Sequence, residues 1–283
     1  MSYGTCTVSI PHVHRMGELE APSVWRLPTN ITSEAAFFAD VSARVHEPEH
    51  SNEFLFVHGY NVTFADAARR TAQIAYDLAF AGAPVFYSWP SQGNTAAYTM
   101  DEQNVEWAQA NLRRFLEDFL TRSNTQNVYL IAHSMGNRAL TRALAPLLAD
   151  KPTLAARLKE VILTAPDIGA DVFKRDIAPA LAASGRPITL YASSGDLALT
   201  ASKKVHGYPR AGDSGKGLVI VKGIETIDAT GMDTSLLGHS HFADSRSVLS
   251  DLFNLVRNHQ QADQRFGLRR VESPMGRYWT FKK

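Results

Sequence analysis

Short apolar runs rich in β-branched and aromatic residues recur through the middle of the chain, and each ends at a turn signal. Segments with helical periodicity separate them, and the clearest covers residues 64–82, with Ala, Ile and Leu on one face and a Gly near its end. This alternation predicts a mostly parallel sheet with helices on both faces, whose ligands lie beyond the carboxyl ends of the strands. The runs predicted as buried strands are FLFVHG, PVFYSWP, VYLIAHS, VILTAPD and ITLYASSGD.

The two ends of the chain are less regular. Within residues 1–50, the segments TVSIPHVH and AAFFADVSARVH are predicted as edge strands around a Pro-containing loop. Farther on, GLVIVKGIETID is predicted as a strand or hairpin and FADSRSVLSDLFNLVRNH as the last amphipathic helix. The basic tail, residues 263–283, is predicted as a surface segment held by Phe266, Tyr278 and Trp279.

The composition and charge of the chain favour a single α/β domain and disfavour nucleic-acid binding. The 283 residues are 45% hydrophobic, enough for one α/β domain with a substantial core. The formal net charge is +1, and acidic and basic residues are scattered along the chain. Because no electrostatic field gathers phosphates or anionic lipid, no nucleic-acid partner is expected. Nothing in the sequence indicates an oligomeric state.

The location of the protein is predicted from cysteine content and from the N-terminus. Cys6 is the single cysteine, so no intramolecular disulfide can form, and the first residues lack the basic start and long apolar core of a secretory signal. No apolar run approaches the roughly 20 residues that a membrane-spanning helix needs. We therefore expect a cytoplasmic protein without stable membrane insertion.

Ser134 is the candidate nucleophile. It lies between a strand-like and a helix-like run, with the small residues Ala132 and Gly136 two positions to either side. This small-x-Ser-x-small pattern is typical of the nucleophile elbow, a turn so tight that larger side chains would collide with the neighbouring strand and helix. The alternative is that Ser134 only caps the N-terminus of a helix. This stretch by itself leaves both interpretations open.

A serine hydroxyl needs an acid and a base, which on this fold follow in the order Ser, acid, His. Asp196, after a predicted strand and a Gly-containing turn, is favoured as the acid, and Asp167, after the preceding strand, is the rival. His239 and His241 are the candidate bases in GHSHFAD. Spacing does not choose between them, although Gly238 suits a sharp loop that would favour His239.

The oxyanion of the reaction would need backbone donors. One is expected to be the N–H of Met135, directly after the nucleophile, and the second the N–H of Tyr60 in the loop after the first predicted strand. In the same loop, His58 is expected to be a structural imidazole bonded to the backbone. Thr63 and Asp66 then mark a capping-box-like helix start.

With these residues identified, the chain resembles the α/β-hydrolase superfamily and, more closely, the bacterial DUF900 family of alpha/beta hydrolases of unknown function. The resemblance implies an eight-stranded type of sheet, with Ser134 as nucleophile, Asp196 as acid and His239 as base, because the GHS block of that family matches at His239. That family usually has an aromatic residue where His241 stands. The blocks that carry the resemblance are VSIPHVHRMGELE, FVHGYNVTFADAARRTAQIAYDL, FYSWPSQG, AHSMGNRAL, TAPDI, RPITLYASSGDLAL, RAG, TIDAT and GHSHFADS.

The resemblance carries an expectation of carboxylic ester hydrolysis, in which a small-molecule acyl ester forms an acyl-enzyme on Ser134 and no cofactor takes part. Only about twenty residues separate TAPD from RPITLY, too few for a large cap domain. We therefore expect an open site walled by residues 89–100 and 205–212. The side chains predicted to line its acyl pocket are Trp89, Tyr98, Leu199 and Tyr208.

Three alternatives stay open. An acyltransferase or thioesterase would use the same triad and differ only in the acyl donor or acceptor. Metal-dependent hydrolysis through His239, His241 and Asp244 lacks the support of an H-x-x-x-H helix or a carboxylate cluster. A non-catalytic binding module on a hydrolase fold would not need all triad residue types in order.

Overall fold

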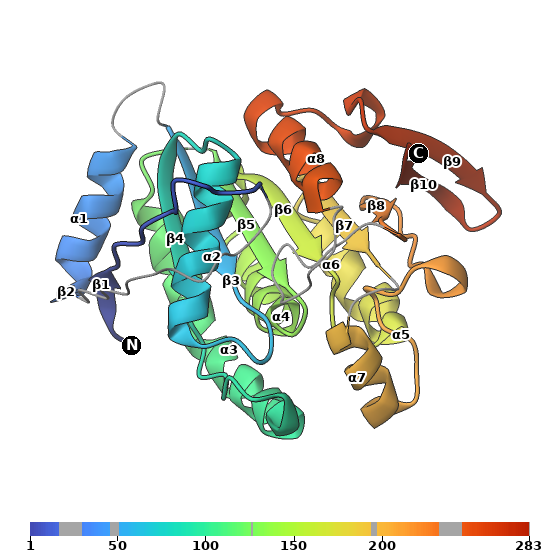
Figure 1. The fold of residues 1–283 in the computed structure, drawn as a ribbon, viewed down its shortest axis with the longest axis horizontal. Helices are drawn as coiled ribbons and strands as arrows, with labels where there is room; N and C mark the ends of the chain where they lie inside the picture. Colours follow the sequence, from blue (N-terminus) through green and yellow to red (C-terminus); the bar gives the residue numbers. More distant parts are fainter. Residues whose placement is uncertain (17–29, 46–50, 126, 194–196, 232–244, 283) are drawn as a thin grey trace.

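An eight-stranded sheet with the strand order β4-β3-β5-β6-β7-β8-β10-β9 forms the centre of the protein (Figure 1). The computed structural model describes residues 1–16, 30–45, 51–125, 127–193, 197–231 and 245–282. The strands of this sheet are β3 (Asn52–Val57), β4 (Gly82–Tyr87), β5 (Val128–His133), β6 (Leu158–Thr164), β7 (Ile188–Ala192), β8 (Glu225–Asp228), β9 (Leu268–Ser273) and β10 (Gly276–Phe281). All the neighbouring pairs are parallel except β9 and β10, as predicted for a mostly parallel sheet.

The five predicted buried runs form β3 to β7, which confirms this part of the sequence analysis. Their side chains alternate between the two faces of the sheet, so each strand contributes to two cores. In β5, Leu130 and Ala132 belong to one core, whereas Tyr129 and Ile131 belong to the other. Because both faces are covered, the strands read as continuous apolar runs.

Helices cover both faces of the sheet. Helices α2 and α8 pack their apolar residues on one face, and α1, α3, α4 and the segment from α5 to α6 pack on the other. A single π-helical turn, Phe173–Ile177, joins α5 to α6. The helices are α1 (Glu34–Arg44), α2 (Phe64–Asp77), α3 (Tyr98–Arg122), α4 (Gly136–Asp150), α5 (Ala170–Val172), α6 (Ala178–Ala182), α7 (Leu197–His206) and α8 (Ser245–Asn258). No helix among the described residues is both long and apolar enough to cross a membrane.

The prediction of N-terminal edge strands is wrong at both segments. Residues 7–14 are not a strand, and most of AAFFADVSARVH forms α1. Ser33 caps this helix by accepting a hydrogen bond from the Ala36 N–H, and Phe38 and Val41, three positions apart, are buried on one helical face. The strands in this region are β1 (Tyr3–Thr5) and β2 (Asn30–Thr32), which form a separate antiparallel pair.

The C-terminal tail, predicted as a surface segment, forms the β9–β10 hairpin and completes the sheet beside β8. The sequence analysis did not predict these two strands. Trp279 is buried, with its indole N–H donating to Asp263, whereas Phe266 is 86% exposed and its ring contacts the Lys282 ammonium group. Within GLVIVKGIETID only the last four residues form a strand, β8, while the predicted last helix is confirmed as α8.

Candidate active site

Ser134 occupies a strained turn between β5 and α4. Its φ angle is +48°, in the left-handed region that a residue with a side chain rarely adopts. The turn also leaves no room for side chains around it: a Cβ on Gly136 would lie 2.4 Å from the His58 carbonyl oxygen, and one on Gly59 would lie 3.1 Å from the Ser134 Cβ. This geometry explains the small-x-Ser-x-small pattern.

The hydroxyl of Ser134 does not cap the following helix. The N-cap of α4 is Met135, and no side-chain hydrogen bond caps this helix. Ser134 is 1% exposed, and within the described residues its Oγ has no hydrogen-bond partner. The N-cap interpretation is therefore excluded, and the hydroxyl is held in place by the backbone rather than by a hydrogen bond of its own.

The two predicted oxyanion donors lie on the loops that meet at this turn. Met135 follows Ser134 and is fully buried, and Tyr60 follows Gly59, where a Cβ would lie 3.1 Å from the Ser134 Cβ. In the described part of the chain, neither main-chain N–H donates a hydrogen bond to the protein. The Tyr60 hydroxyl donates to the Thr95 carbonyl, and an oxyanion role of the two amides stays a prediction.

His58 is a structural residue, as the sequence analysis expected. Its Nδ1–H donates to the Gly59 carbonyl at 2.9 Å, and its ring stacks on Trp89 with the centroids 5.1 Å apart. The Trp89 indole N–H in turn donates to the His58 carbonyl at 2.7 Å. Burial lowers the pKa of His58 to about 4, so the ring is neutral near pH 7 and fixes the loop that carries Tyr60.

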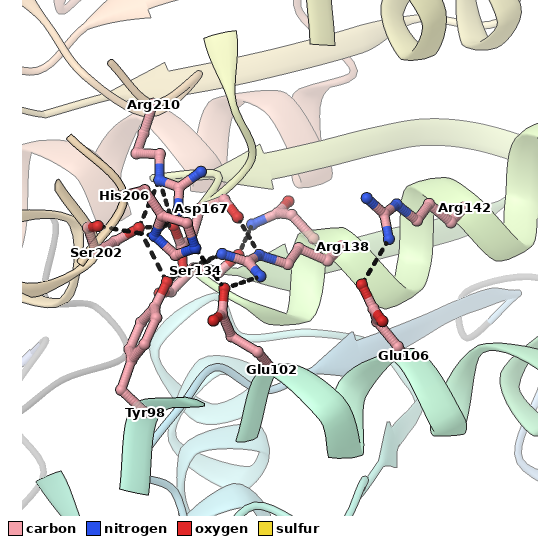
Figure 2. A network of polar contacts seen from close by, with 11 residues as sticks. Tyr98, Glu102, Glu106, Ser134, Arg138, Arg142, Asp167, Ser202, His206 and Arg210 are labelled. Atoms are coloured by element: carbon pink, nitrogen blue, oxygen red, sulfur yellow. Dashed lines mark hydrogen bonds and ion pairs between the residues drawn. The ribbon is translucent and has the colours of Figure 1, made fainter. Parts of the chain in front are cut away.

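Asp167, the rival acid, lies in a buried polar network between α3, α4 and α7 (Figure 2). One carboxylate oxygen accepts from the Tyr98 hydroxyl at 2.6 Å and pairs with Arg138 at 3.2 Å. The other accepts from the Ser202 hydroxyl and pairs with Arg210 at 3.1 Å. With four donors and no exposed surface, this carboxylate has no free position for an imidazole.

Glu102 and His206 extend the network toward the surface. Arg138 pairs with Glu102 at 2.6 Å, and the same carboxylate lies 2.8 Å from His206 Nε2. Burial and the neighbouring Asp167 charge raise the pKa of the Tyr98 hydroxyl well above its usual value, so it stays a hydrogen-bond donor to Asp167. The two arginines and the two carboxylates balance in charge, which allows this cluster to be buried.

Sequence reasoning missed Arg138, Ser202 and Arg210. Arg138 stands in an otherwise small and apolar helix start, and a charge at such a position could have signalled a buried pair. Ser202 and Arg210 carried no comparable signal, because their partner Asp167 lies more than thirty residues away along the chain.

Of the four predicted pocket residues, three are buried. Trp89 and Leu199 are almost inaccessible, and Tyr98 is engaged by Asp167. Tyr208 is 51% exposed and lines a cavity of about 360 Å³ together with Leu218 and Met275. A role of these residues in binding substrate stays a prediction.

The predicted acid Asp196 and the predicted bases His239 and His241 lie outside the described residues, as does Asp244. The strands that precede them, β7 and β8, end at Ala192 and Asp228 on the same sheet edge as β5. Within the described ranges, no three His, Cys, Asp or Glu side chains gather in a way that could hold a metal ion.

A known protein family matches most of the chain. The family model described as "Alpha/beta hydrolase of unknown function (DUF900)" matches residues 33–258. Among solved structures, a predicted CIB-like hydrolase from Thermoplasma acidophilum is 16% identical and has a TM-score of 0.44, with 75% of this chain and 89% of that chain covered. A lipase-esterase related protein from Clostridium acetobutylicum is 13% identical and has a TM-score of 0.43, with 74% and 96% covered. No curated protein matches the sequence.

Proposed function

Because this chain belongs to the DUF900 family of alpha/beta hydrolases, we propose that it is a serine hydrolase that cleaves carboxylic esters with Ser134 as the nucleophile. The observation that carries this proposal is the backbone conformation of Ser134, with a φ of +48° at a strand-to-helix turn and an Oγ without a partner among the described residues. A strained turn persists where the surrounding structure enforces it, and such turns cluster at active sites.

In the proposed reaction, the His239 imidazole takes the proton of the Ser134 hydroxyl as Oγ attacks the ester carbonyl carbon. The carbonyl oxygen becomes an oxyanion and accepts hydrogen bonds from the N–H groups of Met135 and Tyr60. When the tetrahedral intermediate collapses, the alkoxide leaves and takes the proton from the imidazolium, so an alcohol departs and an acyl-enzyme remains. Asp196 orients the imidazole and stabilises its charged form.

Water completes the cycle. The same imidazole takes a proton from a water molecule, whose oxygen attacks the acyl carbon and forms a second tetrahedral intermediate. The Ser134 Oγ then leaves with the proton that the imidazole returns, and the acid product is released. An acyl acceptor other than water at this step would make the protein an acyltransferase.

The test is the intact mass of the protein after exposure to a fluorophosphonate, which phosphonylates an activated serine with loss of fluoride. We expect one adduct on the wild type, no adduct on Ser134→Ala and a much slower reaction of His239→Ala. Ser184→Ala, which removes a half-buried hydroxyl elsewhere in the protein, is the control and should react like the wild type. A folded wild type without an adduct, or an adduct that persists in Ser134→Ala, would refute the proposal.

A screen of p-nitrophenyl esters follows if Ser134 is labelled. We expect turnover of short or medium acyl chains that disappears in Ser134→Ala. Labelling of Ser134 without hydrolysis of any ester would keep the nucleophile and reject the ester substrate class. Adding a thiol or alcohol acceptor to the same assay tests acyl transfer, which would appear as a new thioester or ester in place of the free acid.

A further inference from the structure

The loop after β6 holds the segment that follows the predicted acid. Asp167 accepts a hydrogen bond from Ser202 on α7 and pairs with Arg210. The main chain adds further bonds, because the N–H of Ala211 donates to the Ile168 carbonyl at 2.7 Å and that of Gly212 donates to the Pro166 carbonyl at 2.9 Å. Residues 202–212 are therefore fixed against residues 165–168.

Gly212 makes this contact close. A Cβ at this position would lie 2.4 Å from the Ala165 carbonyl carbon, so the two backbones touch without an intervening side chain. The Gly212 carbonyl also accepts a hydrogen bond from the N–H of Ser193, at 2.8 Å. Ser193 precedes Asp196 in the sequence and Ser202 follows it, so both flanks of the acid segment are attached to one support.

The same support is attached to the nucleophile. The N–H of Asp167 donates to the Ser134 carbonyl at 3.2 Å. Arg138, on the helix that starts after Ser134, donates through Nε to the Asp167 carbonyl and pairs with its carboxylate. Asp167 thus connects the nucleophile elbow to α7, the helix that begins directly after Asp196 (Figure 2).

We propose that Asp167 is a positioning residue, which connects the turn at Ser134 to the described residues on either side of Asp196, and that it is not the acid of the triad. This inference rests on the proposed function. We infer this role because the Asp167 carboxylate is buried and both of its oxygens already bind donors from α3, α4 and the 202–210 segment. A misplacement of about 1 Å in a catalytic group can cost about 100-fold in rate, so loosening this support should slow the chemistry without abolishing it.

The test is a double-mutant cycle on the rate of fluorophosphonate labelling, with Asp167→Asn and Asp196→Asn alone and together. Loss of a triad acid slows the reaction by about 10⁴-fold, and we expect that from Asp196→Asn. Asp167→Asn should slow labelling by about 10- to 100-fold in the wild-type background. In the Asp196→Asn background it should change the rate by less than about 3-fold, because residues that act through one another are not additive.

Ser202→Ala can replace Asp167→Asn in the same double-mutant cycle. It removes the α7 hydrogen bond to Asp167 and an acceptor for Arg210 and Tyr98, but it changes no atom of the arginine–carboxylate pairs. It therefore tests the link to α7 if Asp167→Asn does not fold. Glu106→Gln is the matched control, because it breaks the exposed Arg142–Glu106 pair between α3 and α4 (Figure 2). The control should label like the wild type.

Three outcomes overturn the inference. Equal slowing by Asp167→Asn in both backgrounds would show that its effect is independent of Asp196. Unchanged labelling of folded Asp167→Asn and Ser202→Ala would show that the support is not needed. Near-complete loss in Asp167→Asn with a fast Asp196→Asn would make Asp167 the acid. Each requires a wild type that is labelled at Ser134, so failure of the proposed function is distinguishable from failure of this inference.

Discussion

The side-chain amide of Asn137 donates to the Ser134 carbonyl at 3.0 Å, one turn into α4 from the elbow. The same amide nitrogen lies 3.1 Å from the Thr164 carbonyl at the end of β6. Asn137 is fully buried, so its two hydrogen bonds tie the strained residue to the neighbouring strand. We infer that Asn137 helps to keep Ser134 at its positive φ.

Asn137→Ala should therefore lose both stability and reactivity. Both carbonyl oxygens would lose the Asn137 side-chain donor but keep a main-chain donor, the Asp167 N–H for Ser134 and the Ser134 N–H for Thr164. Each lost hydrogen bond should therefore cost about 0.5–1.5 kcal/mol. Urea unfolding measures the free energy, and the rate of fluorophosphonate labelling at Ser134 measures the relaxation of the elbow. Asn258→Ala, which removes an exposed helical side-chain hydrogen bond, should change neither quantity appreciably. Full reactivity in a folded Asn137→Ala would show that the turn does not need this support.

Gly136→Ala tests the close approach of the elbow to the loop after β3. The added methyl would lie 2.4 Å from the His58 carbonyl oxygen and 2.6 Å from that of Val57, and backbone must move to admit it. We expect the free energy of unfolding to fall by about 3 kcal/mol or more, at the upper end of the destabilisation seen in overpacked cores. Labelling of Ser134 should be lost as well. Gly267→Ala, where no heavy atom lies within 4 Å of the new methyl, should be tolerated. Equal melting temperatures of the two variants would contradict the clash.

Glu53 predicts a pH dependence of stability that is separate from catalysis. It is fully buried in β3, and this burial raises its pKa from 4.5 to about 7, against the smaller opposing effects of Ser123 and Arg157. Between these two values the folded protein holds a proton that the unfolded chain has released. The stability contributed by Glu53 is thus present below about pH 4.5 and is lost as pH rises through about 7.

Glu53→Gln should remove this dependence. One pKa unit corresponds to about 1.4 kcal/mol, so the variant should gain on the order of 3 kcal/mol relative to the wild type between pH 4.5 and pH 8. Urea unfolding of both proteins at several pH values measures the difference. Glu106→Gln, at an exposed site, should leave the dependence of the free energy of unfolding on pH unchanged. If the free energies of unfolding of Glu53→Gln and the wild type differed by the same amount at every pH, the raised pKa of Glu53 would be contradicted.

Arg265 forms a second buried charge cluster beneath α8. Its guanidinium lies 2.7 Å from Asp251 and 3.0 Å from Glu225, and both Arg265 and Asp251 side chains are almost completely inaccessible. Arg265→Leu would leave the Asp251 charge buried without its cation, at a cost of about 3–5 kcal/mol. The double variant Arg265→Leu with Asp251→Leu should recover part of this loss. Arg277→Leu, which breaks an exposed pair with Glu272, should cost at most about 1 kcal/mol in thermal or urea unfolding.

Strands β3 to β7 could be predicted from the sequence because burial on both faces makes each one a continuous apolar run. The tight turn at Ser134 could be predicted because a side chain at Gly136 would collide with the backbone after β3, which the small-x-Ser-x-small pattern reflects. Both signals are local: a few consecutive residues contain all the information, so one sequence suffices to find them.

The missed elements have weaker local signals. In β9, the run LRRVES lies at the sheet edge and its side chains are mostly exposed, so no apolar alternation marks it as a strand. The α1 segment combines aromatic and β-branched residues typical of strands with a helical packing face. The Asp167 network joins residues from five separate segments, and only the fold brings Tyr98 and Ser202 together.

The β9–β10 hairpin also has a consequence for the synthesis of the protein. β8 has four residues and pairs with β7 on one side and β10 on the other. Until β10 has left the ribosome, the outer edge of β8 presents unpaired backbone groups, and such edges recruit strands from other chains. In the folded protein β10 covers this edge, and chains that end before residue 276 would leave it open to pairing with another chain.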